Sequence, residues 1–257
     1  SKEADFSRTF IQKAISEGYI TVNGSVVKSN YKVHEGDLIS VNLPETKKDE
    51  IPVAEDIPLD IVFEDDEIIV VNKPAGMVVH PAAGINSGTL VNAILSRLTT
   101  EEDVLDDEIS DLTSISPQRP GIVHRIDKGT SGLLVVAKTI DAYYNLSAQF
   151  NEHSINRKYI AVVCGNPKQE KGTIIAPIGR SRHDRKKMTV THINSRSAIT
   201  HFNVLEYYDK FSLVEIKLET GRTHQIRVHF SYIGHPIVGD PDYGGQKRAL
   251  KTQAPPI

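Results

Sequence analysis

The chain of 257 residues is 39% hydrophobic and 25% charged, an ordinary globular composition that excludes a disordered chain, a collagen and a disulfide-rich scaffold. It contains no run of about eighteen apolar residues, which excludes a membrane-spanning helix. The net charge of −3 hides an asymmetry, because residues 1–120 carry 10 basic and 22 acidic side chains whereas residues 121–257 carry 20 and 11. Such a basic half can bind a phosphate backbone, and two solvated faces of unlike charge are the alternative.

Residues 1–44 predict a small module of one helix and short strands. Apolar residues recur at helical spacing over residues 6–18. Asn23-Gly24 is a dipeptide typical of a tight hairpin turn, which predicts a strand on either side of it. Residues 45–58 are charged, contain prolines and lack periodicity, so they predict a linker. The strands expected in the module are 19–22, 26–28 and 38–43.

Residues 59–257 predict one larger α+β domain built on a mixed, mainly antiparallel sheet. Many short apolar runs are interrupted by a few segments with helical periodicity. Residues 99–120 hold seven acidic side chains and few apolar ones, which predicts a mobile acidic insert. The expected strands are 60–63, 68–71, 133–137, 158–163, 173–177, 187–191, 198–207 and 212–219, and the expected helices are 89–98, 140–153 and 223–233.

Polar side chains that can support chemistry gather first in the segment GIVHRIDKGTSGLLVVAK, residues 121–138. His124, Arg125 and Asp127 lie there, just ahead of a strongly apolar strand. Loops at strand ends are where a rigid scaffold presents reactive groups. The alternative without chemistry is a salt-bridged turn.

A second group of such residues is the segment ETGRTHQIRVHFSYIGHPIVGDPDYGG, residues 219–245, in which a helix is expected to begin near Thr220. His224 and His229 are five positions apart, not the four of a zinc-binding helix, and no third ligand lies beside them. We therefore expect no metal site, and hydrogen bonding of both histidines in a polar pocket. The single cysteine, Cys164, can form no internal disulfide and is expected to be buried.

A third group is the run GRSRHDRKK at residues 179–187, which holds five basic side chains in nine residues. Such a run is typical of contact with a nucleic-acid backbone, and surface charge on a hairpin is the alternative. The residues expected to contact phosphates are Arg180, Arg182, Arg185 and Lys186.

Taken together, four separated motifs resemble the RluA/RluD-type pseudouridine synthases of large-subunit ribosomal RNA. The motifs are NKPAG at 72–76 with His80, HRIDKGTSGLLVVAK at 124–138, RKY at 157–159 and LETGRTHQIRVHFSYIGHPIVGDPDYG at 218–244. The likeness covers nearly the whole chain, and the N-terminal module resembles the S4-type RNA-binding module. The departures are Gly129 at a variable position, Ile126 in place of a commoner leucine, and the long acidic insert. The insert puts the identity of the substrate in question rather than the chemistry.

This resemblance implies an isomerase without a cofactor that moves a uridine's ribose bond from the ring nitrogen to carbon five. Asp127 would be the catalytic carboxylate, either attacking the sugar or removing a ribose proton. Its guanidinium partner would be Arg222, with Arg227 as the second choice. Tyr159 would stack on the target uracil with its hydroxyl near carbon five, and Leu218 would form part of an apolar wall.

The same resemblance implies that the target uridine leaves its base stack, because its reacting atoms are otherwise out of reach. Arg125 would fill the gap that the flipped base leaves, and His124 would contact the substrate beside it. The N-terminal module would add a second, tethered contact to the RNA.

Three alternatives remain open at this stage. A glycoside hydrolase or base-excising glycosylase would need a second positioned carboxylate, for which the motifs offer only Glu219, so isomerisation fits better. A non-catalytic RNA-binding ribosome-assembly factor would not need Asp127, Tyr159 and Arg222 together. Transfer or messenger RNA could replace ribosomal RNA as the substrate.

We expect a monomer whose partner is RNA, with ribosomal RNA in a structured stem-loop as the leading choice and no membrane or metal partner. The compartment would be the bacterial cytoplasm, or a mitochondrion or chloroplast. The chain begins at Ser1 rather than at methionine, so a preceding leader stays possible.

Overall fold

The computed structural model describes residues 8–42, 52–82, 84–98, 112–113, 116 and 118–247. The chain divides into two compact units, Ser1–Ile51 and Pro52–Ile257. Most of the acidic insert predicted at residues 99–120, and part of the linker predicted at 45–58, lie outside the described residues.

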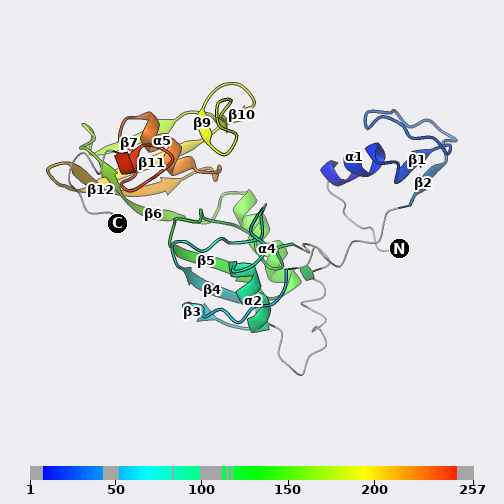
Figure 1. Ribbon diagram of the computed structural model, residues 1–257, viewed down its shortest axis with the longest axis horizontal. Coiled ribbons are helices and arrows are strands. Elements are labelled where there is room, and N and C mark those ends of the chain that lie inside the picture. The colour runs from blue at the N-terminus through cyan, green and yellow to red at the C-terminus, as the bar shows by residue number, and fades with distance from the viewer. Residues whose placement is uncertain are drawn as a thin grey trace. The chain divides into compact units, whose positions relative to one another are not determined.

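The first unit contains one helix and a two-stranded antiparallel sheet (Figure 1). The helix is α1 (Arg8–Ser16), and the strands are β1 (Ile20–Val22) and β2 (Ile39–Val41). The predicted turn forms, since Asn23 and Gly24 have φ angles of 51° and 75° and Val22 bridges to Ser25 beyond them. Both angles are positive, as a tight hairpin turn with this dipeptide requires.

The strand predicted at residues 26–28 is wrong, because β1 pairs with β2 instead. The side chain of Asn23 explains this choice. Its amide nitrogen donates to Asp37 at 2.8 Å, and its amide oxygen accepts from the backbone N–H of Leu38 at 2.9 Å. These bonds bring the chain back to the turn just before β2 begins, so β2 takes the place beside β1.

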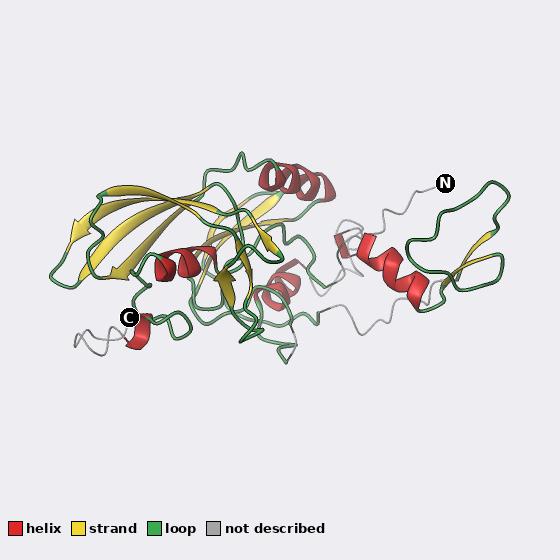
Figure 2. Ribbon diagram, turned by 90° about the horizontal axis from the view of Figure 1, so that it is seen from above, coloured by secondary structure: helices red, strands yellow, loops and turns green. Residues whose placement is uncertain are grey.

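Figures 1 and 2 show the strands of the second unit as arrows and its helices as coils. Among the described residues, this unit contains ten strands and three helices of eight residues or more. They are, in chain order, β3 (Ile61–Glu64), β4 (Ile68–Lys73), α2 (Leu90–Leu98), β5 (Gly132–Ala137), α4 (Ile140–Asn151), β6 (Lys158–Cys164), β7 (Lys171–Ile175), β8 (Ile178–Arg180), β9 (Met188–Val190), β10 (Ser195–Arg196), β11 (Ile199–Tyr207), β12 (Phe211–Leu218) and α5 (Gln225–Tyr232).

β4 is the central strand of the first sheet in this unit, whose order is β3–β4–β5. Alternate residues Ile69, Val71 and Lys73 point inward and are fully buried. The helix α2 packs on this core, and its residues Leu90–Leu95 are all buried. This burial explains why the helix is apolar on more than one face.

β12 is a central strand of the second sheet, whose order is β6–β12–β11–β7. Ser212, Val214 and Ile216 alternate inward and are buried. Phe230 of α5 completes this core. Tyr159 of β6 contacts the buried clusters of both the first and the second sheet, so it lies where the two halves of the unit meet.

A third, small sheet has the order β10–β8–β9 and carries a hairpin loop over residues 181–187. Every strand pair in the described part of the chain is antiparallel, which confirms the predicted α+β class with a mainly antiparallel sheet. The buried position predicted for Cys164 is also confirmed. No helix in the described ranges has the length and apolar character needed to cross a bilayer.

The helix predicted over residues 223–233, with its start near Thr220, begins later than expected, at Gln225. The cause is His224, whose φ of 56° is left-handed and cannot continue a right-handed helix. This local backbone decides which side chains of the motif lie on the helix, and therefore which of them can reach a common site.

Candidate active site

A cleft of about 680 Å³ opens between the two halves of the second unit. Its walls come from the loop before β5, the segment leading into β6, the end of β12 and the start of α5. It brings together seven of the residues predicted from sequence: His124, Arg125, Asp127, Tyr159, Leu218, Arg222 and Arg227. The other four, Arg180, Arg182, Arg185 and Lys186, lie on or beside the hairpin loop between β8 and β9.

The loop that carries Asp127 is anchored from the interior by Lys73, at the end of β4. The ammonium group of Lys73 donates to the carbonyls of Pro74 at 2.7 Å, Met77 at 2.9 Å and Lys128 at 3.4 Å. Burial lowers the pKa of Lys73, and the nearby charge of Asp127 acts in the opposite direction. One buried cation thus ties the NKPAG loop to the residue that follows Asp127.

Asp127 pairs with Arg227, whose Nη1 donates to Oδ2 of the carboxylate at 3.2 Å. The sequence analysis named Arg222 as the first choice for the guanidinium partner of Asp127 and Arg227 as the second. The structure has Arg227 in that position, so the first choice is wrong. Arg222 lines the same cleft, but its Nε donates to the backbone carbonyl of Ser197 at 3.0 Å. The late start of α5 explains the difference, because it places Arg227 in the first turn of the helix and Arg222 in the segment before it.

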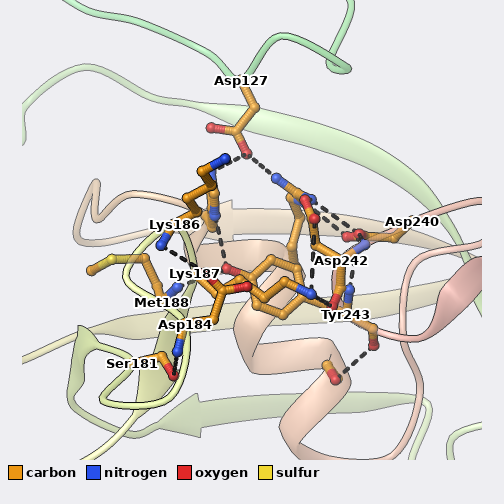
Figure 3. A network of polar contacts seen from close by, with 12 residues as sticks. Asp127, Ser181, Asp184, Lys186, Lys187, Met188, Asp240, Asp242 and Tyr243 are labelled. Carbon is orange, nitrogen blue, oxygen red and sulfur yellow. Dashed lines mark hydrogen bonds and ion pairs between the residues drawn. The ribbon is translucent and has the colours of Figure 1, made fainter. Parts of the chain in front are cut away.

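Two further carboxylates, Asp240 and Asp242 (both labelled in Figure 3), bind the guanidinium of Arg227. Asp240 accepts two bonds, from Nε at 2.8 Å and from Nη2 at 3.0 Å, and Asp242 accepts from Nη2 at 2.6 Å. Burial alone would lower the pKa of Arg227, but the bonds to Asp240 and Asp242 outweigh it and raise that pKa. Arg227 therefore stays charged, and its orientation is fixed before it meets Asp127.

His224 is a second neighbour of Asp127, with its Nε2 4.0 Å from Oδ2 of the carboxylate. Its Nδ1 lies 2.8 Å from the hydroxyl of Tyr243. Burial is the largest influence on His224 and lowers its pKa, while the negative charge of Asp127 acts to raise it. The polar pocket expected around this histidine is thus present, and it includes Asp127.

Gln225 explains how the start of α5 is fixed. Its amide oxygen accepts from the hydroxyl of Thr220 at 2.8 Å and from the backbone N–H of Arg222 at 2.9 Å. Its amide nitrogen donates to the Ile199 carbonyl and to the Thr200 hydroxyl, both at 3.0 Å. Because all four bonds of this buried amide must be kept, the segment from Thr220 to Gln225 is held in a single conformation.

His229, one turn further along α5, is fully buried. It lies 2.9 Å from both the carbonyl of Ala176 and the hydroxyl of Thr200. Because the carbonyl can only accept, Nε2 carries the proton and Nδ1 accepts from the threonine. Its hydrogen bonds are satisfied within the core.

Tyr159 and Leu218 form an apolar part of the cleft wall, as predicted. Burial raises the pKa of the Tyr159 phenol, the charge of Arg157 lowers it, and the charge of Asp127 raises it. The phenol therefore keeps its proton near neutral pH and offers a flat ring with one polar end inside the cleft.

His124 and Arg125 lie side by side in sequence but have different surroundings. His124 stacks on Phe150 at 4.4 Å between ring centroids, and its Nε2 accepts from the backbone N–H of Val135 at 3.0 Å. Burial, with the charge of Arg157 adding to it, lowers the pKa of His124 to about 4. Arg125 is exposed and lies 3.4 Å from His80. Of the two, Arg125 is the one free to meet a ligand.

Arg157 is a cleft residue that the sequence analysis named only as part of the RKY motif. Two of its guanidinium nitrogens, Nε and Nη2, are buried and find no hydrogen-bond partner among the described residues. Its Nη1 lies so close to Gly221 that a Cβ there would come within 2.9 Å of it. The glycine of the TGR sequence therefore makes room for Arg157, a further arginine in the cleft wall.

The basic run forms the loop of a β-hairpin, in which Arg180 pairs with Met188 across β8 and β9. Arg180 closes the loop by donating to the carbonyl of Arg185 at 2.7 Å. The side chains of Arg182, Arg185 and Lys186 are exposed. Three cations on one loop, with no role in the core, are available for a polyanion.

Sequence reasoning missed Asp240, Asp242 and Tyr243 as individual site residues, although it quoted the GDPDYG sequence that holds them. The available signal was two carboxylates within a segment that also contains a proline and glycines, close after an arginine-bearing helix. Lys73 was missed in the same way within NKPAG. Among the described residues there is no group of three or more His, Cys, Asp or Glu side chains that could hold a metal ion.

Comparisons with known proteins identify the family. The family described as RNA pseudouridylate synthase matches residues 67–232, and the S4 domain matches residues 4–39. The chain is 50% identical over 247 residues to "Uncharacterized RNA pseudouridine synthase YlyB" of Bacillus subtilis, covering 96% of this chain and 78% of that protein. It is 46% identical over 246 residues to "Ribosomal large subunit pseudouridine synthase D" of Zymomonas mobilis, covering 95% and 74%.

A solved structure, "Human RNA Pseudouridylate Synthase Domain Containing 1", aligns with a TM-score of 0.58 at 29% identity, covering 76% of this chain and 73% of that one. The family match spans both the loop of Asp127 and the helix of Arg227, and the relatives align over nearly the whole chain. The chain therefore belongs to the RNA pseudouridine synthase family, isomerases that act on RNA, and it carries an S4 domain at its N-terminus.

Proposed function

We propose that this enzyme converts a uridine of large-subunit ribosomal RNA to pseudouridine, with Asp127 as the catalytic carboxylate. The supporting observation is the geometry of Asp127, which lies in an open cleft, 3.2 Å from an arginine that is itself fixed by two other carboxylates. A charged, oriented carboxylate in a partly enclosed site is what cleavage at the ribose carbon requires. The relative named as a ribosomal large-subunit synthase supports the choice of RNA.

The reaction is balanced within the substrate. The bond between the ribose carbon C1′ and ring nitrogen N1 breaks, a bond between C1′ and ring carbon C5 forms, the proton on C5 leaves, and N1 gains a proton. Asp127 acts on the ribose, as a nucleophile at C1′ or as a base that removes a ribose proton. Both routes use the carboxylate as an anion, and Arg227 donates a charge-assisted hydrogen bond to it at 3.2 Å.

The target base must leave its stack to enter this cleft, at a cost of a few kcal/mol. Stacking on Tyr159 would recover about 1–3 kcal/mol, which is of the same size. The exposed guanidinium of Arg125 is suited to fill the vacated place in the RNA. Arg182, Arg185 and Lys186 would contact phosphates, and the S4 domain would add a tethered second contact. Such a substrate would place the enzyme where ribosomes are assembled, in a bacterial cytoplasm, a mitochondrion or a chloroplast.

The test is a map of pseudouridines in total RNA from cells that lack the gene and from the same cells given back the wild-type chain or Asp127→Asn. We expect specific sites in large-subunit ribosomal RNA to disappear, to return with the wild type, and to stay absent with Asp127→Asn although that variant still binds RNA within several-fold. Loss of sites only in transfer or messenger RNA would overturn the substrate. Full restoration by Asp127→Asn would overturn the role of the carboxylate, and release of free uracil would indicate a hydrolase.

A further inference from the structure

Tyr243, labelled in Figure 3 beside Met188, contacts both neighbours of Asp127 and also β9, the second strand of the basic hairpin. Its hydroxyl accepts from the backbone N–H of Met188, the first residue of β9, at 2.9 Å. The same hydroxyl lies 2.8 Å from Nδ1 of His224, and the ring lies 4.9 Å from the guanidinium carbon of Arg227. Neither the sequence analysis nor the proposed reaction assigns a role to Tyr243.

The direction of the bond between Tyr243 and His224 follows from counting donors. A phenol has one proton to donate and can accept bonds on its oxygen. Burial raises the pKa of Tyr243, so the phenol keeps its proton, and the N–H of Met188 already donates to the oxygen. The phenol of Tyr243 therefore donates its own proton to Nδ1 of His224, and Nδ1 is the acceptor in this bond. A neutral imidazole whose Nδ1 accepts carries its own proton on Nε2, the nitrogen 4.0 Å from Asp127.

The backbone of His224 supports a role at the site rather than a place in general packing. Its φ of 56° is uncommon for a residue other than glycine, and such conformations persist where surrounding contacts hold them. The charged groups that face this imidazole are Asp127, Arg227, Asp240 and Asp242. Within the described part of the chain, the hydroxyl of Tyr243 is the neutral hydrogen-bond partner of the His224 ring and can select its tautomer.

We infer that Tyr243 is a positioning residue, which holds the Nε2–H tautomer of His224 toward Asp127 and fixes the face of Arg227, so that both donors are directed at the carboxylate. The inference rests on the proposed role of Asp127. With Nε2–H directed at it from 4.0 Å, Oδ2 of Asp127, the oxygen that accepts from Arg227, faces a second possible donor. Rotation of the imidazole or loss of this tautomer would remove that donor and leave the ion pair with Arg227 in place.

The same residue links the catalytic carboxylate to the basic hairpin. Lys187, the last residue of the hairpin loop, donates to the carbonyl of Asp242 at 2.9 Å, and the Asp242 side chain accepts from Arg227. Met188 follows immediately and donates to Tyr243. The base of the hairpin is thus bonded to two consecutive residues that hold the partners of Asp127, so an RNA phosphate bound on the loop would steady the catalytic groups.

The test compares Tyr243→Phe, which keeps the ring over Arg227 and loses the hydroxyl, with Tyr207→Phe. The control removes the same group from a tyrosine that donates to the Pro167 carbonyl at 3.3 Å and does not line the cleft. We expect kcat on the mapped RNA to fall about tenfold in Tyr243→Phe, the size of one lost hydrogen bond, with KM unchanged. Tyr207→Phe should change neither. Thermal melting of both variants checks that they are folded.

Nitrogen-15 NMR of the histidine side chains gives a second readout that needs no RNA substrate, so it stands even if the proposed function fails. We expect His224, assigned by its loss in His224→Gln, to be the Nε2–H tautomer in the wild type and a mixture in Tyr243→Phe. In the His224→Gln background, Tyr243→Phe should cause no further loss of kcat. An unchanged tautomer, or a kcat within twofold of the wild type, would overturn the inference.

Discussion

Arg227 meets Asp127 at 3.2 Å across 100 positions of sequence, yet it gives that carboxylate only one of the four hydrogen bonds that it makes to carboxylates. The other three go to Asp240 and Asp242. The side chain of Asp240 is 3% exposed whereas that of Asp127 is 23% exposed. Asp240 therefore serves to hold the arginine, and Asp127 is the carboxylate that a substrate in the cleft can reach.

Replacing Arg227 should damage folding as well as activity. In Arg227→Gln the buried Asp240 loses its bidentate partner, and breaking a buried pair by removing one member costs about 3–5 kcal/mol. Chemical denaturation of the whole chain measures this loss. Activity should fall in the same variant because Asp127 loses its donor.

Arg222→Gln is the matched control, since Arg222 lies in the same motif and the same cleft, and its side chain bonds a backbone carbonyl rather than a carboxylate among the described residues. It should lose less than about 1.5 kcal/mol, the contribution of an ordinary hydrogen bond. Equal destabilisation by the two substitutions would contradict the assignment of Arg227 as the central cation.

The choice between these two arginines shows where sequence reasoning reaches its limit. Hydrophobic periodicity predicted a helix in this segment correctly, because packing of an amphipathic face determines that much. It could not predict the left-handed backbone of His224 or the four bonds of Gln225, which set the residue at which the helix begins. Which arginine meets Asp127 depends on the residue at which the helix begins, and the spacing of residues along the sequence does not determine that residue.

Contacts between segments that are distant in the sequence were also not predictable from the sequence. The apolar run at residues 68–71 predicted a strand, but β4 continues to Lys73, whose burial depends on three carbonyls from two loops. Asp240 likewise binds Arg227 only because the folded chain places the segment after α5 back against that helix. The motifs and the fold class were predictable, whereas the residues that hold Asp127 and Arg227 together were not.

Tyr159 is predicted to act mainly through its ring. Tyr159→Leu removes the flat surface in the cleft, so RNA affinity should fall by about 1–3 kcal/mol, the value of one base stacked on an aromatic ring. Tyr159→Phe keeps that surface and should bind RNA as the wild type does, while turnover slows because the hydroxyl is lost. Filter binding and single-turnover kinetics on the same RNA separate the two effects. A Phe variant that binds as weakly as the Leu variant would argue against stacking.

Reversing the charge of Arg182, Arg185 and Lys186 together should weaken RNA binding and flatten its dependence on salt. Each lost phosphate contact lowers the slope of log K against log salt by about 0.7–0.9. The exposed Lys168, in the turn between β6 and β7, is a suitable control when it is changed to glutamate. Binding isotherms at a series of salt concentrations provide the measurement. An unchanged slope in the triple variant would mean that the hairpin loop faces solvent in the complex.

The pH dependence of stability tests the surroundings of His124. Its pKa is lowered to about 4 by burial and by the charge of Arg157, while in the unfolded chain it is about 6.5. Between these values the unfolded state binds a proton that the folded state does not, so the free energy of unfolding falls as pH drops through this window. The loss should level off below the folded pKa, at about 3 kcal/mol in total.

His124→Gln should remove this contribution, because glutamine does not titrate and its carbonyl oxygen can accept from the backbone N–H of Val135 in place of Nε2. Urea denaturation between neutral pH and pH 4 should therefore show a variant that is less stable than the wild type at pH 7 but loses about 3 kcal/mol less on acidification. The exposed His192, changed to glutamine, should leave the curve parallel to that of the wild type. Parallel curves for His124→Gln and the wild type would show that this imidazole takes up its proton at the same pH in the folded and unfolded chains, contrary to the effect expected from its burial, its stacking on Phe150 and its bond from Val135.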